Sequence, residues 1–176
     1  MVLGDGNPSR DDSGKAISEG GCEEEQGFDQ EDVSGERLMD ELIKAVFSLY
    51  AGSSGASLRA LTTGGMWLSQ APQQSTGVYI VVTPIVAPIQ NAMSTDATKP
   101  WTQDCDIQFT FSTLNGTTYD VLAAEKAFFG IYQHCSFSMT GNTLLVSRRI
   151  NTQGPTRDDF TRGYMMYAEY RFTIGG

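Results

Sequence analysis

Few side chains of this sequence have the chemistry for catalysis or metal binding. The chain has one histidine, His134, which could serve as a general base or hydrogen-bond to the last carbonyl groups of a helix. Asp104 and Asp106 share one face if they lie in a strand, and they could hold a cation together with Asp96 or Asp120. A solvated polar face explains the same spacing more simply, and we favour that interpretation.

The common catalytic sequence motifs are missing from this chain. It has no nucleophile elbow, zinc-protease motif or dinucleotide fingerprint, and Gly64-Gly65 lacks the Lys-Ser/Thr of a phosphate-binding loop. The three cysteines, Cys22, Cys105 and Cys135, lie far apart, which favours neither a disulfide framework nor a zinc site. We therefore expect no catalytic residue, no cofactor and no metal, and synthesis in a reducing cytoplasm.

Arginines near the C-terminus are the only concentration of positive charge in the body of the chain. Arg148 and Arg149 would point to opposite faces of a strand, so a shared phosphate-binding patch is a weak alternative. Arg157 precedes an acidic pair that begins at Asp158, which indicates local or intersubunit ion pairs. Arg162 falls on the otherwise apolar face of the predicted closing strand, where an unpaired charge is costly. We expect Arg162 at a margin of the sheet or against a carboxylate of a neighbouring chain.

The acidity of the chain is concentrated at its N-terminus. The formal net charge is −9, and residues 1–37 hold eleven of the 21 acidic residues but three of the 12 basic ones, so the rest carries −1. A nearly neutral body has no electrostatic footprint for nucleic acid. Residues 1–33 have too few apolar side chains to offset the entropy of ordering them, so we expect a disordered acidic extension before one domain over residues 34–176. Neither a signal peptide nor a membrane span is expected.

Apolar periodicity predicts an α+β domain. Helices are predicted from about residue 34 to 50 and from 118 to 132, each with an apolar stripe. Pro84 and Pro88 are expected to stop regular strand pairing. Strands are predicted at residues 66–69, 78–83, 101–113, 135–139, 143–150 and 160–174, with polar loops at 86–100 and 151–159. A mostly antiparallel sheet of about five to six strands, with two helices packed on one face, is the simplest arrangement that buries both stripes.

The alternation from Trp101 to Thr113 is long for a single small domain. At ~3.3 Å per residue its 13 residues run to ~43 Å, well beyond the ~17–20 Å of a typical strand. Such a strand usually pairs or packs with another chain, which favours an assembling protein over an enzyme. Trp101 directly follows the loop at 86–100, and we expect it at an interface. The candidate contact residues for a neighbouring subunit or partner are Trp101, Lys99, Asp96, Arg157, Asp158 and Arg162.

The order of these elements, and the short motifs inside them, resemble the tail-terminator or tail-completion proteins of long-tailed bacteriophages. The matching motifs are a short strand with an Ala-Pro-Gln turn at Met66–Gln73, an apolar strand at Tyr79–Val82, a long alternating strand at Asp106–Thr113, and an aromatic-rich closing alternation at Asp158–Phe172. The resemblance covers about residues 36–174. The acidic N-terminus and the insertion at 86–100 depart from it, so it assigns them no role.

The resemblance implies a virion protein that makes and breaks no bond. It implies a ring, typically a hexamer, on the head-proximal end of the tail tube, which stops tube polymerisation and presents a surface to the neck of the head. The partners would be further copies of the chain, the major tail tube protein and a head–tail connector protein. DNA would pass through the ring without sequence-specific binding, and no membrane is involved. The protein would be made in the host cytoplasm and reside in the tail or neck of the virion.

Two other classes of function remain open from the sequence. The first is another connector component, such as a head–tail adaptor or stopper, or a minor tail protein, which would differ in its partner and not in its chemistry. The second is a small-ligand or nucleotide-binding α+β domain, or an enzyme that uses Asp104, Asp106 and His134.

Overall fold

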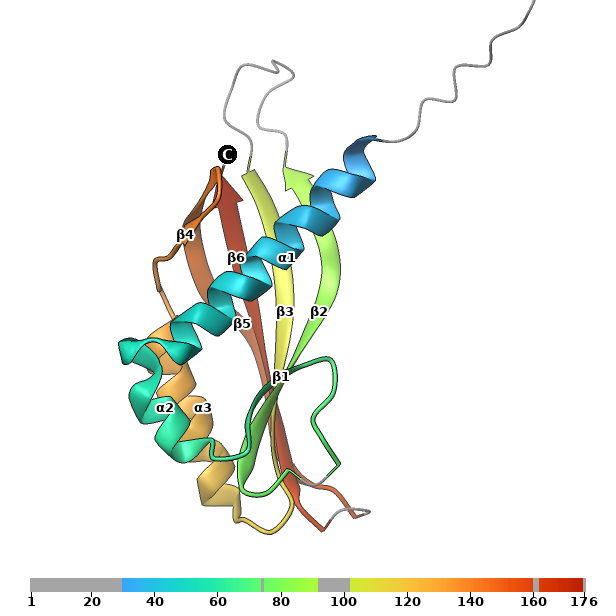
Figure 1. Ribbon diagram of the computed structural model, residues 1–176. Helices are drawn as coiled ribbons and strands as arrows, with labels where there is room; N and C mark the ends of the chain where they lie inside the picture. Colours follow the sequence, from blue (N-terminus) through green and yellow to red (C-terminus); the bar gives the residue numbers. More distant parts are fainter. Residues whose placement is uncertain (1–29, 74, 92–101, 160–161, 176) are drawn as a thin grey trace, which may run out of the picture.

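The computed structural model describes residues 30–73, 75–91, 102–159 and 162–175 (Figure 1). Three α-helices, one 3-10 turn and six strands are found in these residues. In chain order they are α1 (Gln30–Ala51), the 3-10 turn (Ser53–Gly55), α2 (Ala56–Leu61), β1 (Gly65–Leu68), β2 (Val78–Asn91), β3 (Thr102–Thr113), α3 (Thr118–Tyr132), β4 (Ser138–Met139), β5 (Asn142–Arg157) and β6 (Tyr164–Gly175). The predicted α+β class is confirmed.

The six strands form one sheet in the order β1-β2-β3-β6-β5-β4. Every neighbouring pair is antiparallel except β1 and β2, which are parallel. The prediction of a mostly antiparallel sheet is therefore confirmed, with one parallel pair at its edge and a short third helix, α2, beyond the two that were predicted.

The described helices cover one face of the sheet and leave the other open. α1 crosses the sheet diagonally, and α2 and α3 lie beside it (Figure 1). The stripe of α1 is buried as predicted, with Leu42 and Val46 at 0% exposure, and it belongs to the same core cluster as the alternate residues of β3 and β6. Because successive strand residues point to opposite faces, the remaining residues of β3 and β6 make up the open face.

Aromatic rings form the centre of the core between α3 and the sheet. Phe128 and Tyr132 of α3 are stacked with ring centroids 4.0 Å apart, and Phe109 of β3 lies 4.4 Å from Phe128. Tyr170 of β6 meets Phe109 edge-on at 5.6 Å. The hydroxyl of Tyr132 donates a 2.7 Å hydrogen bond to the carbonyl of Val46, which ties α3 to α1 across the core.

The start of α3 is fixed by a capping box. The backbone N–H of Thr117 donates to the carboxylate of Asp120 at 2.6 Å, and the Thr117 side chain accepts from the helix in return. The predicted helix from residue 118 to 132 is confirmed at both ends. The first helix instead begins earlier than predicted, at Gln30.

Several predicted boundaries in the sheet are wrong. Pro84 and Pro88 do not end β2, which runs on to Asn91 with register shifts that accommodate the two prolines. The predicted strand at 135–139 shrinks to Ser138–Met139, and the predicted loop at 151–159 belongs to β5 as far as Arg157. The part of the predicted 86–100 loop beyond Asn91 lies outside the described residues.

Candidate functional site

An ion-pair network on the open face joins β3 to β6. Arg171 donates two hydrogen bonds to the carboxylate of Asp106, Nε to Oδ1 at 2.8 Å and Nη2 to Oδ2 at 2.7 Å. A second carboxylate, that of Asp104, lies 3.9 Å from Arg171 Nη1 and accepts a 2.6 Å hydrogen bond from the Thr173 hydroxyl. The hydrogen bonds to Asp106 raise the pKa of Arg171 above its ordinary value. These groups therefore hold the two central strands together.

This network contradicts the sequence interpretation that we favoured for Asp104 and Asp106. They are not a merely solvated face, and Asp120 cannot share a cation with them, because it caps α3 beyond the far end of β3. Asp104 and Thr113 are nine residues apart along β3, or about 30 Å at ~3.3 Å per residue. In the described part of the chain, no group of three or more His, Cys, Asp or Glu residues could hold a metal ion. Asp96 lies outside the described residues.

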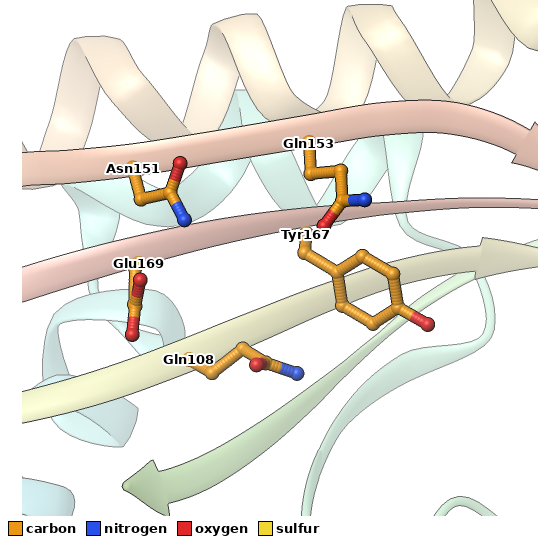
Figure 2. Close-up of a pocket in the computed structure, with 5 residues that line it drawn as sticks. All are labelled: Gln108, Asn151, Gln153, Tyr167 and Glu169. Carbon is orange, nitrogen blue, oxygen red and sulfur yellow. The ribbon is translucent and has the colours of Figure 1, made fainter.

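A shallow polar groove of about 400 Å³ lies beside this network on the open face (Figure 2). Its lining residues come from β3, β5 and β6, and they are Gln108, Asn151, Gln153, Tyr167 and Glu169. Three of the five side chains are amides, which can bind a polar surface through hydrogen bonds but transfer no proton at neutral pH. The other two lining residues are one carboxylate, Glu169, and one phenol, Tyr167, with no histidine, lysine or second carboxylate among the five. The arrangement is suited to contact and not to acid–base chemistry.

Arg149 ties the outer strand β5 to α3 on the opposite side of the sheet. Its guanidinium pairs with the carboxylate of Glu125, which is 9% exposed, and lies 4.4 Å from the ring centroid of Phe129. The backbone N–H of Arg149 donates a 2.9 Å hydrogen bond to the side chain of Gln133. Arg148 is exposed on the open face, where it is the cross-strand neighbour of Arg171. The prediction that adjacent arginines point to opposite faces is confirmed, and no phosphate-binding patch forms from them.

His134 follows α3 and lies at the outer edge of β5. Its backbone N–H donates to the carbonyl of Ser147 at 2.9 Å, and its ring Nε2 lies 3.1 Å from the side-chain nitrogen of Gln133. The ring makes contact with this amide and not with the last carbonyl groups of α3, so the expected capping role is wrong. β5 and β6 lie between His134 and β3, the strand that carries Asp104 and Asp106. The three residues cannot form one catalytic site.

The predicted contact residues fall into two groups. Trp101, Lys99 and Asp96 lie outside the described residues. Arg157 ends β5, Asp158 follows it, and the backbone N–H of Asp158 donates to the carbonyl of Gly163 at 2.9 Å, so the structure brings Arg157, Asp158 and Arg162 together at the β5–β6 connection. Arg162 is exposed just before β6, which begins at Tyr164, so it lies at a margin of the sheet as expected, although the closing strand itself starts later than predicted.

The partners of the two aspartates were not foreseen from the sequence. Asp104 and Asp106 are spaced like Arg171 and Thr173, and in two antiparallel strands such spacings can be complementary. That pattern is the signal that was available. It becomes informative only with the register that places Asp106 opposite Arg171.

Comparisons with known proteins give a fold and no family. No protein-family model matches this chain, and no curated protein matches it. One chain of a solved structure described as "Virion of native gene transfer agent (GTA) particle" superposes with a TM-score of 0.64 at 16% sequence identity. The match covers 79% of this chain and 98% of that one. A second solved chain aligns with a TM-score of 0.40 at 10% identity, over 80% of this chain and 93% of its own length, and carries no argument. The chain therefore shares its fold with a protein of a virion particle.

None of the described helices is long and apolar enough to cross a membrane.

Proposed function

We propose that this chain is a structural component of a phage-like virion, and that it forms the ring that caps the head-proximal end of the tail tube. The observation that carries the proposal is the fold that this chain shares with a chain of the gene transfer agent virion, in a match that covers 98% of the virion chain. The resemblance of the sequence motifs at 66–73, 79–82, 106–113 and 158–172 to tail terminators supports the more specific role.

The surface chemistry of the open face supports an assembling role. Two of its carboxylates, those of Asp106 and Asp104, are bound by Arg171 and Thr173, and its groove is lined mainly by amides. Three carboxylates, Asp104, Asp106 and Glu169, face two guanidinium groups, Arg148 and Arg171. Such a face has no excess of positive charge that would hold a polyanion, so DNA could pass along it without being bound.

The mechanism that we propose is the control of polymerisation by surface shape. One end of the ring would present the surface of another tube layer and so bind the growing end of the tube. The opposite end would lack the surface that recruits the next layer and would instead meet the connector proteins of the head. The energy would come from burial of contact surface, and no bond would be made or broken.

The experiment combines solution mass with tube growth. Light scattering of the full chain, alone and with the tail tube protein of the same particle, should give a discrete ring mass, with a hexamer expected. Addition during tube polymerisation should shorten the tubes in negative-stain micrographs. Addition after polymerisation is the control, and it should decorate one end without changing the length. A chain that stays monomeric and leaves tube length unchanged would overturn the proposal.

The same micrographs separate the terminator from other connector components. A head–tail adaptor or stopper would bind connector proteins and leave tube growth unaffected. Rings that bind a connector protein but never shorten tubes would therefore replace the terminator role with an adaptor role.

A further inference from the structure

The exposed apolar side chains of this chain are concentrated at the two outer edges of its sheet. Nine large hydrophobic side chains are exposed among the described residues, and six of them lie at these edges. One edge carries Trp67 and Leu68 of β1 and Ile85 of β2, and the other carries Leu145, Val146 and Ile150 of β5. Scattered exposed hydrophobic residues need no explanation, but a concentration at two edges does.

Part of the outer edge of β5 has no strand beside it in the described part of the chain. β4 pairs only with residues 142 and 143 of β5. The next part is covered by the residues after α3, because His134 N–H donates to Ser147 and Gln133 accepts from Arg149. From Ile150 to Arg157 no described element pairs with this edge, and we call this segment the open β5 edge. Backbone groups along such an edge can pair with another chain.

The opposite edge of the sheet is open at the same height. Following the register across the sheet, Thr152 of β5 lies level with Leu68 of β1, through Ala168, Phe109 and Val82. β1 has no described strand on its outer side. Ile85 follows at the level of Arg148 and Arg149, just beyond the end of β1 and about one residue past Ile150. β1 therefore lies level with residues 152–156 of the open β5 edge, and Ile85 lies about one residue beyond the level of Ile150; we call β1 together with Ile85 the β1 edge.

The strand directions of the two edges are also compatible. β1 is parallel to β2, and each later step across the sheet to β5 reverses direction, so β5 runs antiparallel to β1. If a second copy continued the sheet, its β1 would form an antiparallel pair with the open β5 edge, without crossing connections.

Both edges carry bulges whose extra residue is aliphatic. The register shifts between Pro84 and Val86 and between Arg149 and Asn151 leave Ile85 and Ile150 as the extra residues, 43% and 40% exposed. Bulged edges limit uncontrolled strand pairing, because they twist the backbone away from a flat template. Natural edges are usually protected by charged residues, yet these two bulges expose isoleucine.

We propose that the open β5 edge of one copy pairs with the β1 edge of a second copy of this chain, with Ile150 packed against Leu68 or Ile85 of the neighbour. The contact joins two different edges, so it is head-to-tail, and its repetition closes a ring when the rotation per subunit allows it. The closure of the assembly into a ring rests on the proposed function. The new inference is the edge contact that would join neighbouring subunits of that ring. The pair of unlike edges, equal in height and opposite in direction, identifies a second copy as the occupant.

The test is a directional disulfide between two variants that each carry one added cysteine. The full chain with Cys22→Ser is the parent, because Cys105 is fully buried and Cys135 is partly buried. Ile150→Cys is mixed with Ile85→Cys, and separately with Leu68→Cys, and each mixture is oxidised mildly. A covalent dimer should form in at least one mixture and not in any variant alone, because the contact joins unlike edges.

Tyr119→Cys is the matched control. Tyr119 is 82% exposed and lies on α3 and not on an edge strand, so Tyr119→Cys mixed with Ile150→Cys should give no dimer above the parent. No dimer in either edge mixture, in samples in which light scattering reports rings, would overturn the edge contact and leave the terminator proposal standing. An edge dimer in a protein that never affects tail tubes would support the edge contact and overturn the terminator proposal. Monomers at every concentration, with no dimer in any mixture, would overturn both.

A charge substitution provides the second readout. Ile150→Asp places a carboxylate in the proposed contact and should weaken ring formation at least tenfold in dissociation constant, about 1.4 kcal/mol or more. Because Ile150 is exposed at a bulge, the variant should keep its fold, and circular dichroism checks this. Mixing Ile150→Asp with Ile85→Lys should restore part of the association, and rings of unchanged stability in Ile150→Asp would contradict the contact.

Discussion

Two buried tyrosines in the same aromatic cluster should respond in opposite ways to the loss of a hydroxyl group. Tyr132 and Tyr170 are both at 0% exposure, and each lies against Phe128. The hydroxyl of Tyr132 donates to the Val46 carbonyl at 2.7 Å. The hydroxyl of Tyr170 has no hydrogen-bond partner among the described residues. The change to phenylalanine is therefore the same chemistry at two sites that differ in one interaction.

The expected magnitudes follow from these partners. Tyr132→Phe removes one hydrogen bond, and the Val46 carbonyl keeps its place inside α1, so the free energy of unfolding should fall by about 1 kcal/mol. Tyr170→Phe removes a buried polar group that has lost its water without compensation, so the free energy of unfolding should rise by about 1 kcal/mol. The two variants should differ by about 2 kcal/mol, or about 4–8 °C in melting temperature for a chain of this length.

The assay is urea unfolding of the full chain at one protein concentration, followed by circular dichroism. Each variant serves as the control for the other, because the volume removed and the cluster are the same. A Tyr170→Phe variant that loses as much stability as Tyr132→Phe would refute the reasoning. It would show that the Tyr170 hydroxyl is satisfied in solution, and that the two sites do not differ as the structure indicates.

Three further predictions concern the helix α3 and the core. Glu125→Ala should lower the free energy of unfolding by about 2–3 kcal/mol in urea titrations, because it leaves the partly exposed Arg149 unpaired, while the exposed neighbour Lys126→Ala should change it by less than about 0.5 kcal/mol. The hydrogen bonds at the helix start lower the pKa of Asp120 from 3.8, so its contribution is full above that pH and is lost as the pH falls through the lower folded value. Unfolding curves of Asp120→Asn and of the unchanged chain should therefore differ at neutral pH and converge in acid, and a constant difference would contradict this. Burial raises the pKa of the Cys105 thiol to about 12, so iodoacetamide should label it only on global unfolding, which peptide mass spectrometry detects.

The parts of the fold that follow from local pattern were predictable. The alternation of β3 and the capping box of α3 are written in neighbouring residues, and both elements lie where the sequence places them. In β5, by contrast, most residues after Ser147 are exposed and no amphipathic alternation exists to be recognised. The strand is held by its long pairing with β6, which is a tertiary property, and bulges change which face its residues occupy.

The parallel pairing of β1 and β2 was equally hidden. Only residues 69–77 connect them, fewer than the dozen or more that usually return a chain for a parallel pair, so a hairpin was the natural expectation. The ion pair between Asp106 and Arg171 was hidden for a related reason. Its partners are 65 residues apart, and their meeting depends on a register that no local pattern fixes.

Ligand binding and assembly can be distinguished by which surface groups already have hydrogen-bond or packing partners. A small-ligand site needs polar groups that gain their best partners when the ligand binds. On the open face Asp104, Asp106 and Arg171 already have partners, so a ligand would have to compete with the Asp106–Arg171 and Asp104–Thr173 contacts. At the two edges the situation is reversed, because apolar side chains and an unpaired strand segment would gain stability only when another surface covers them. Burial at the edges is therefore the stronger driving force available to this molecule, and it favours assembly over ligand binding.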